Sequence, residues 1–269
     1  MWLGTKSSIN RRPRGDSAAV ARSGGNYTVN IIQPSLSYSF DNILWGMTGP
    51  LNGLRGEATV ELLPPFSFIK EPFISGEIDF RDYLHLWKRF VWANRLFIGA
   101  SQSLSASASP RRYLLGGSEN WLFTYSDINY DQYEKNVRYA FYSAMVVPFR
   151  GWRYFDLSGT RVAVFNTEFR FPFIKEFSTV FPLPLAIRYI NGAVFADIGN
   201  AWDRSDQVGG LPLPRKVYAG VGFGCRMDLG MFILRYDRGW PLDVGEVFAS
   251  HGKPPPGPPV NYFSLGAEF

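Results

Sequence analysis

The chain has 269 residues, of which 46% are hydrophobic and 17% aromatic, and its formal net charge is +5. It has no run of about 18 apolar residues, and its mean hydropathy is −0.10, which excludes a helical membrane protein. The single cysteine excludes an internal disulfide and a cysteine-based zinc site. Because the basic residues are dispersed, the charge does not indicate a nucleic-acid-binding protein.

Residues 1–26 are basic and rich in small residues, and Arg11, Arg12 and Arg14 form the only local cluster of charge. A segment of this composition buries too little apolar surface to offset the entropy cost of folding. We therefore expect a basic flexible segment over 1–26 and a folded domain over 27–269.

From Tyr27 onward, apolar and polar residues alternate in nine segments of about the 9–11 residues that a tilted strand needs to cross a bilayer. In the last segment, Phe263, Leu265 and Phe269 lie on one face and Tyr262 on the other. Apolar outer faces and polar inner faces are typical of a transmembrane antiparallel β-barrel, an all-β fold. The predicted strands are 30–40, 54–63, 73–83, 90–103, 161–171, 188–199, 216–227, 231–238 and 260–269.

The stretch 104–160 shows no such alternation and is far too long for an ordinary connection between strands. It is either a functional loop or a region whose strands the alternation misses. Near its end stands the tetrapeptide Phe149-Arg150-Gly151-Trp152.

The two strands after this loop each carry an inward carboxylate, Glu168 and Asp197. An arginine inside a barrel is costly unless carboxylates meet its donors. A loop folded into the lumen, with Arg150 bound to Glu168, Asp197 or both, satisfies these charges. Spacing alone leaves open the alternative that each group faces luminal water separately.

Three glycines, Gly220, Gly222 and Gly224, alternate along one predicted strand. A nucleotide-binding loop needs a strand, a turn and a helix in succession, and no helix pattern follows here. Glycines on the inner face instead leave space for another backbone to approach the wall. Cys225, an outward position on the same strand, is expected to face lipid or to be packed.

At several of these residues the chain resembles the BamA/TamA superfamily of outer-membrane assembly factors and two-partner-secretion transporters, the bacterial surface antigen family. Phe149-Arg150-Gly151-Trp152 resembles the VRGF/Y loop tetrapeptide of that family. Glu168 with Arg170 resembles its ExR strand motif, and Phe195-Ala196-Asp197-Ile198-Gly199 resembles its FxDxG motif. The resemblance covers most of 27–269, and the motifs occur in the order of the family. Phe149 and Trp152 replace the usual Val and Phe/Tyr, which leaves the subfamily and the substrate open.

The resemblance implies the C-terminal part of a barrel of about 16 strands in the bacterial outer membrane. It implies that the tetrapeptide loop enters from outside and that Arg150 meets the inner wall at Glu168, Arg170, Phe195, Asp197 and Gly199. The strand 260–269 then forms one side of a lateral gate for client strands. Since 1–10 lacks the apolar core of a secretory signal, we expect the natural N-terminus to lie upstream, with 1–26 as an extracellular loop that has been cut open.

The function implied is the insertion of outer-membrane proteins or the translocation of polypeptides, without catalysis, cofactor or metal. The expected partners are outer-membrane lipid, client polypeptides and accessory subunits, with no nucleic acid. A passive pore or structural barrel is the alternative, in which luminal arginines favour anions. A barrel enzyme is disfavoured because His85 and His251 are the only histidines and neither has a nucleophile motif nearby.

Overall fold

The computed structural model of the protein describes residues 2–5, 9–11, 27–29, 33–46, 48–65, 72–105, 110–119, 145–179, 185–204, 213–229, 233–249 and 257–266. Within these ranges nearly all regular structure is β-strand, and the one helix, α3 (Val244–Ala249), has 6 residues. No helix in this part of the chain is long and apolar enough to cross a membrane.

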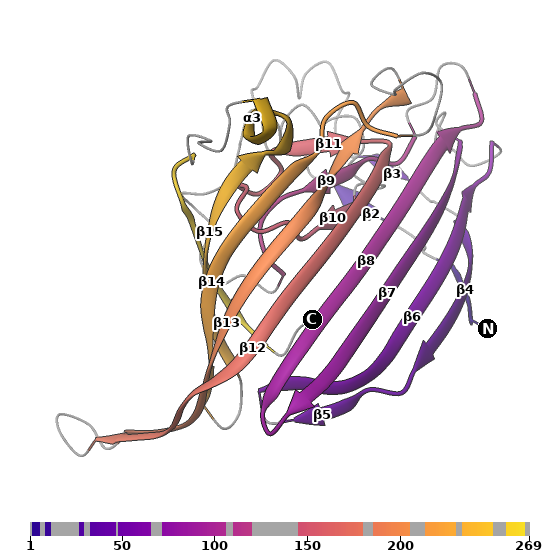
Figure 1. Ribbon diagram of the computed structural model, residues 1–269. Coiled ribbons are helices and arrows are strands. Elements are labelled where there is room, and N and C mark those ends of the chain that lie inside the picture. The colour runs from indigo at the N-terminus through magenta and orange to yellow at the C-terminus, as the bar shows by residue number, and fades with distance from the viewer. Residues whose placement is uncertain are drawn as a thin grey trace.

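One antiparallel sheet of 11 strands dominates the structure (Figure 1). Neighbouring strands along the sheet are β1 (Trp2–Thr5), β4 (Pro34–Asp41), β6 (Gly49–Leu63), β7 (Phe73–Trp87), β8 (Phe90–Ser103), β12 (Arg161–Thr179), β13 (Leu185–Trp202), β14 (Tyr218–Asp228), β15 (Ile233–Asp243) and β16 (Val260–Leu265), with β5 (Leu44–Gly46) paired to one end of β6.

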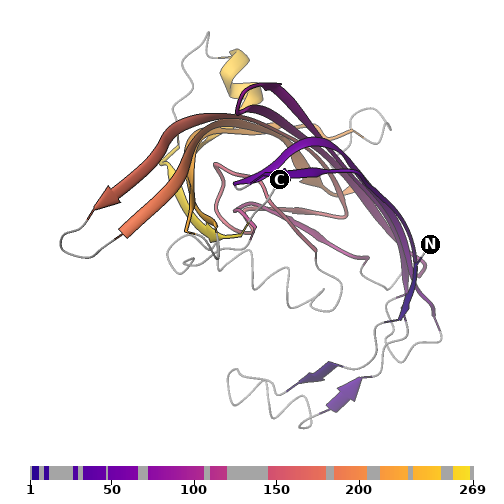
Figure 2. The same ribbon diagram turned by 90° about the horizontal axis from the view of Figure 1, so that it is seen from below.

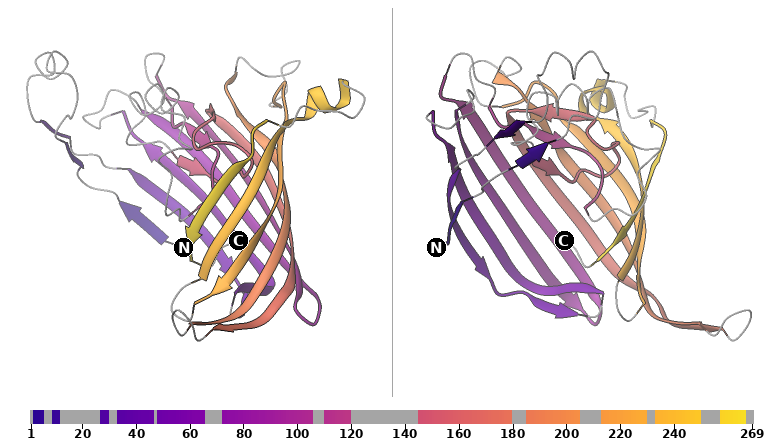
Figure 3. Two further views of the ribbon diagram at one scale, coloured as in Figure 1. Left: turned by 90° about the vertical axis from the view of Figure 1, so that its left-hand side faces the viewer. Right: turned by 180° about the vertical axis from the view of Figure 1, so that it is seen from behind.

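The sheet curves around a concave side that holds part of the chain between β8 and β12 (Figure 2). Within the described residues, β1 and β16 are the two edges of the sheet and do not pair with each other. They lie on opposite sides of the molecule when it is seen from behind (Figure 3). The described strands therefore form an open, barrel-like wall.

All nine predicted strands are present, as β4, β6, β7, β8 and β12 to β16, which confirms the all-β antiparallel fold. The predicted outer faces are exposed, as a wall that meets lipid requires. These exposed outer residues include Leu36, Tyr38, Phe40, Val60, Ile74, Ile78, Phe80, Ile98, Phe165, Phe169, Val194, Ile198, Val221, Phe223 and Phe263. On the predicted inner faces of β12 to β16, the buried residues include Asn166, Glu168, Arg170, Asn191, Asp197, Arg226, Arg235, Asp237, Tyr262 and Ser264. On β4 and β6 the predicted inner faces are more open, and Ser39 and Glu57 are exposed.

The hairpin of β12 and β13 is longer than the predicted strands 161–171 and 188–199. Both strands continue beyond the neighbouring wall, toward the lower left of Figure 1. The register shifts between Pro172 and Ile174, which indicates a β-bulge. A bulge breaks the period of two, so alternation cannot follow a strand through it.

Two regions predicted to be irregular contain short strands. Of residues 1–26 the structure describes two short strands: β1 pairs with β4, and β2 (Ile9–Arg11) pairs with β3 (Tyr27–Val29). Within 104–160, β9 (Tyr113–Leu115) lies between β10 (Met145–Val147) and β11 (Leu157–Gly159) in a small separate sheet. Strands of 3 residues are too short to show a period.

The small sheet packs on the concave face of the wall through an apolar cluster. Phe97, Val162, Val164 and Ala201 project from β8, β12 and β13, and the loop contributes the remaining members, Tyr113, Leu115, Val147 and Phe149. All are buried. The inner wall is therefore apolar where the small sheet covers it, and this packing positions the tetrapeptide.

Candidate functional site

The tetrapeptide forms a tight turn held by the small sheet. The backbone N–H of Phe149 donates to the carbonyl of Gly117 (3.0 Å), and the N–H of Gly117 donates to the carbonyl of Trp152 (3.1 Å). Gly151 has a φ of +96°, which residues with a Cβ rarely adopt. The turn thereby points Arg150 into the wall.

Arg150 binds both carboxylates that the sequence places on the inner wall. Its Nε and Nη2 donate to the two oxygens of Asp197 (3.0 and 2.9 Å), and its backbone N–H also donates to Asp197 (2.8 Å). Its Nη1 donates to Glu168. All three side chains are almost completely buried. The structure thus brings Arg150, Glu168 and Asp197 together.

The environment keeps the Arg150 guanidinium charged. Burial alone lowers the pKa of this group, but the carboxylates of Asp197 and Glu168 more than offset burial and raise the pKa well above its ordinary value. The guanidinium also lies 3.8 Å from the ring centroid of Phe195, a cation–π contact. Phe195 therefore supports the arginine from the wall.

Further charges surround Glu168. Arg170 Nε and Arg226 Nη2 both donate to it at 2.7 Å, and Arg226 Nη1 donates to Asp237 at 2.7 Å. Arg235 Nε also donates to Asp237 at 2.7 Å. Four guanidinium groups and three carboxylates thus form one buried cluster, which we call the charge cluster: Arg150, Arg170, Arg226, Arg235, Glu168, Asp197 and Asp237.

The loop backbone approaches the wall at glycines of β14 and β15. A Cβ on Gly220 would overlap the carbonyl oxygen of Arg150. A Cβ on Gly239 would lie 2.7 Å from the backbone nitrogen of Gly151, and one on Gly222 would lie 2.6 Å from the ring of Phe195. The expected role of leaving space for another backbone at the inner wall is therefore confirmed for Gly220, whereas Gly222 makes room for the neighbouring strand and the Phe195 ring. Gly224 faces the side chain of Asp237 and the Arg226 guanidinium instead.

The tetrapeptide is also bound to the last strand of the sheet. Tyr262 on β16 accepts a hydrogen bond from the N–H of Gly151 (2.8 Å) and donates to the carbonyl of Trp152 (2.7 Å). Trp152 in turn donates from Nε1 to the carbonyl of Ala219 (2.8 Å) and packs edge-on against Tyr218. The loop therefore joins β14 to β16 across the concave side.

Comparison with known proteins identifies the family. The model of the Omp85 superfamily domain matches residues 5–269. The chain belongs to the Omp85 superfamily. Among solved structures, 53 chains match the Omp85 domain described here. No protein of curated function matches its sequence.

One of the matching structures is the crystal structure of BamA from Haemophilus ducreyi lacking POTRA domains 1–3. The TM-score is 0.57 at 12% sequence identity, and the match covers 91% of this chain and 44% of that chain. This likeness shows a shared fold. Together the two findings confirm the resemblance found in the motifs: the chain is an outer-membrane β-barrel protein of a family that inserts or translocates polypeptides.

Within this Omp85 chain, Glu168, Phe195 and Asp197 of the motifs contact Arg150 directly, whereas Arg170 reaches it only through Glu168 and Gly199 does not contact the loop. A Cβ on Gly199 would overlap the backbone of Ala163, so this glycine allows close strand packing rather than contact with the loop. Of the last strand, Phe263 points outward against Tyr236, with ring centroids 4.9 Å apart. Phe269 lies outside the described residues.

Sequence reasoning missed Asp237 and Tyr262 as partners of the loop region. A signal for Asp237 existed, because Arg226 and Arg235 are directly paired across β14 and β15, and like charges facing each other need a carboxylate nearby. Asp237, two residues from Arg235, lies on the same face. For Tyr262 the signal was an aromatic residue on an otherwise polar inner face.

Replacing Tyr262 with phenylalanine is expected to leave the Gly151 N–H buried without an acceptor. Such an orphaned donor costs about 1–3 kcal/mol, so the amide of Gly151 should exchange with solvent roughly tenfold faster or more, as hydrogen exchange would measure. Tyr236→Phe is the matched control, since the Tyr236 hydroxyl bonds Asn261 at the surface. If the Gly151 amide exchanged at the same rate in both variants, Tyr262 would not attach the loop to the last strand.

Proposed function

We propose that this chain is the barrel region of a non-enzymatic machine that inserts outer-membrane proteins or translocates polypeptides. Its clients are polypeptides that form β-strands, and its outer face contacts the lipid of the outer membrane. Accessory subunits complete the working assembly. The family supports the general activity, and the arrangement around the loop supports a role for this particular chain.

The observation that carries the proposal is the attachment of Arg150 at the charge cluster. A barrel wall that only separates two compartments does not need a loop bound to a buried cluster of charges. Here one arginine reaches strands β12 and β13 through Glu168 and Asp197, and the next two residues reach β16 through Tyr262. The loop therefore links the middle of the sheet to its last strand.

The last strand offers the surface that a client strand needs. Within the described part of the chain, β16 pairs only with β15, along Val260–Leu265. An edge strand presents unpaired N–H and C=O groups, on which another strand can form. A client strand adding here would lie next to the strand that holds the loop, so loop and client are mechanically coupled.

The passive pore is less well supported, because its argument rests on luminal arginines that attract anions. The arginines on the predicted inner faces are Arg55, Arg81, Arg95, Arg170, Arg226 and Arg235, and the last four are buried and bound to carboxylates. Arg81 is likewise paired with Asp79 at 2.9 Å. Charges compensated in this way exert little attraction on a passing anion.

Depleting the protein from its native host tests the proposal. We expect the outer membrane to lose a set of other barrel proteins or secreted polypeptides several-fold, and the same polypeptides to accumulate in the periplasm, as quantitative proteomics of the separated fractions would show. Re-expression should restore both. An unchanged outer-membrane proteome, together with slower uptake of small anions, would instead support the pore.

A further inference from the structure

A second arginine of the loop is bound to the other half of the wall. Arg111 stands two residues before β9, where the small sheet begins. Its Nη2 donates to Glu61 on β6 and its Nη1 to Glu77 on β7, both at 2.6 Å. The Arg111 side chain is 7% exposed, so this contact is almost as deeply buried as that of Arg150. One guanidinium group therefore joins two neighbouring strands to the small sheet.

Neighbouring groups fix this arrangement. The amide of Gln33, just before β4, donates to Glu61 (2.5 Å), and the Tyr113 hydroxyl donates to Glu77 (3.1 Å). Tyr113 is fully buried, and a Cβ on Gly99 would lie 2.8 Å from its ring, so β8 leaves room for it. The start of the small sheet is thus held against β6, β7 and β8.

The contact depends on the shape of the arginine as well as on its charge. The planar guanidinium group has donors on separate nitrogens, so it binds Glu61 and Glu77 at the same time. Both carboxylates are largely buried, at 15% and 12% exposed, and a buried carboxylate is costly without a cation. Arg111 therefore both balances charge and fixes the positions of two strands relative to the loop.

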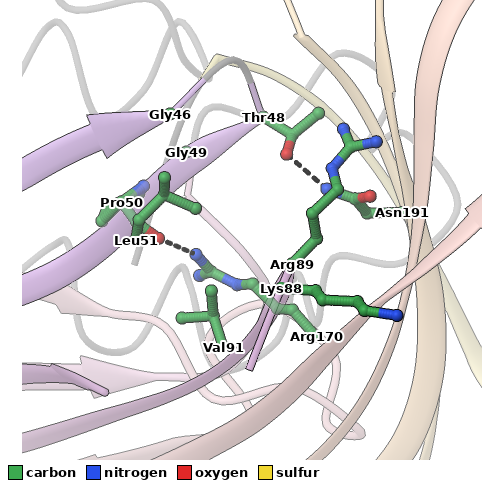
Figure 4. A pocket seen from close by; sticks show the side chains of 10 residues that line it. All are labelled: Gly46, Thr48, Gly49, Pro50, Leu51, Lys88, Arg89, Val91, Arg170 and Asn191. Atoms are coloured by element: carbon green, nitrogen blue, oxygen red, sulfur yellow. Dashed lines mark hydrogen bonds between the residues drawn. The ribbon is translucent and has the colours of Figure 1, made fainter. Parts of the chain in front are cut away.

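The lower end of the concave side is bridged separately, by the tip of the β5–β6 hairpin (Figure 4). The hydroxyl of Thr48 bonds the amide of Asn191 on β13, and the Pro50 carbonyl accepts a hydrogen bond from Arg170 Nη1 on β12 (3.3 Å). The small sheet lies nearer the upper end of the wall (Figure 1). The first strands of the sheet are thus held to β12 and β13 at two levels, by the hairpin below and by the small sheet above.

We propose that Arg111 is a positioning residue, which holds β6 and β7 at a fixed distance from the last strand. The connection runs from Glu61 and Glu77 through Arg111 to the small sheet, and from there through the tetrapeptide to Tyr262 on β16. The loop is then a brace across the concave side, and a displacement of β16 is transmitted to the first strands of the sheet. That clients cause such a displacement rests on the proposed function, whereas the brace itself does not.

Distances between two spin labels across the concave side test the brace. Leu36 on β4 and Val221 on β14 are exposed on the outer face, and cysteines replacing them carry the labels in a Cys225→Ala background. In lipid vesicles we expect one narrow distance distribution by double electron–electron resonance. Arg111→Gln should broaden it and shift it to longer distances, because the first strands lose their connection to the small sheet.

Two further variants separate positioning from charge balance. Arg111→Gln/Glu77→Gln removes one positive and one negative charge, so the net charge of the group is unchanged and no carboxylate loses its balance. The distribution should still be broad, because nothing joins β6 and β7 to the small sheet. Arg112→Gln is the matched control at the next residue. Arg112 binds Asp203 at 3.1 Å with side chains 23% and 36% exposed, and its loss should leave the distribution narrow.

A narrow distribution in Arg111→Gln/Glu77→Gln would overturn the proposal, since Arg111 would then only balance charge. Equal broadening in Arg112→Gln would overturn it as well, because any weakening of the loop would have the same effect. Delivery of clients in the native host should fall several-fold in the double variant and stay unchanged in Arg112→Gln. A broad distribution with full delivery would refute the link between brace and clients, while the depletion experiment decides the proposed function independently.

Discussion

Replacing Arg150 with alanine is expected to lower the free energy of unfolding by about 3–5 kcal/mol, because it leaves a buried charge without its partner. Asp197 is the group most affected, since it loses both hydrogen bonds from the Arg150 side chain and keeps only the one from the backbone N–H. Glu168 keeps Arg170 and Arg226. Urea unfolding in lipid or detergent measures the loss, and delivery of clients to the outer membrane should fall with it.

A double variant separates the effect of the buried charge from the effect of attaching the loop. Arg150→Met combined with Asp197→Asn removes both members of the pair and should recover much of the stability but none of the activity, because the loop remains unattached. Arg55→Ala is the control. Its salt bridge to Asp41 spans 3.7 Å between half-exposed side chains and contributes at most about 1 kcal/mol. An Arg150→Ala protein as stable and active as this control would refute the role of the loop.

Much of the wall could be predicted from the sequence because lipid and a polar interior impose opposite requirements on alternate residues. Tyr38 and Ile78 are exposed on the outer face, whereas Glu168 and Asp237 are buried on the inner face. The alternation of apolar and polar residues breaks down where other constraints also apply. The bulge after Pro172 shifts the faces of β12, and Val162 and Val164 are apolar on the inner side because the loop covers them.

The site was predictable only in part, since alternation assigns a side chain to a face and not to a partner. Arg150 could be assigned to Glu168 and Asp197 because an arginine inside a barrel needs carboxylates to balance its charge. The parallel pairing of β10 with β9 joins residues on either side of a long stretch of sequence and has no local pattern. Likewise, Tyr262 meets Gly151 only because the curved sheet brings β16 under the loop.

Replacing Gly220 with alanine is expected to displace the loop from the wall without removing any charged side chain of the cluster. The added Cβ would overlap the carbonyl oxygen of Arg150, and backbone lies on both sides of the contact, so no side chain can move aside. Overpacking of this kind costs about 1–3 kcal/mol. Limited trypsin digestion measures the result, because the bond after Arg150 is protected while that side chain is 3% exposed and becomes a cleavage site once the loop leaves the wall.

Gly76→Ala is the matched control, since a Cβ at Gly76 meets nothing within 4 Å. On a strand this change should leave stability unaltered or raise it by up to about 1 kcal/mol, because alanine loses less backbone entropy than glycine on folding. If Gly220→Ala loses delivery of clients as Arg150→Ala does, attachment of the loop is required in its own right, apart from the buried charge. If Gly220→Ala exposes the Arg150 bond yet keeps full activity, the seated loop stabilises the wall but takes no part in handling clients.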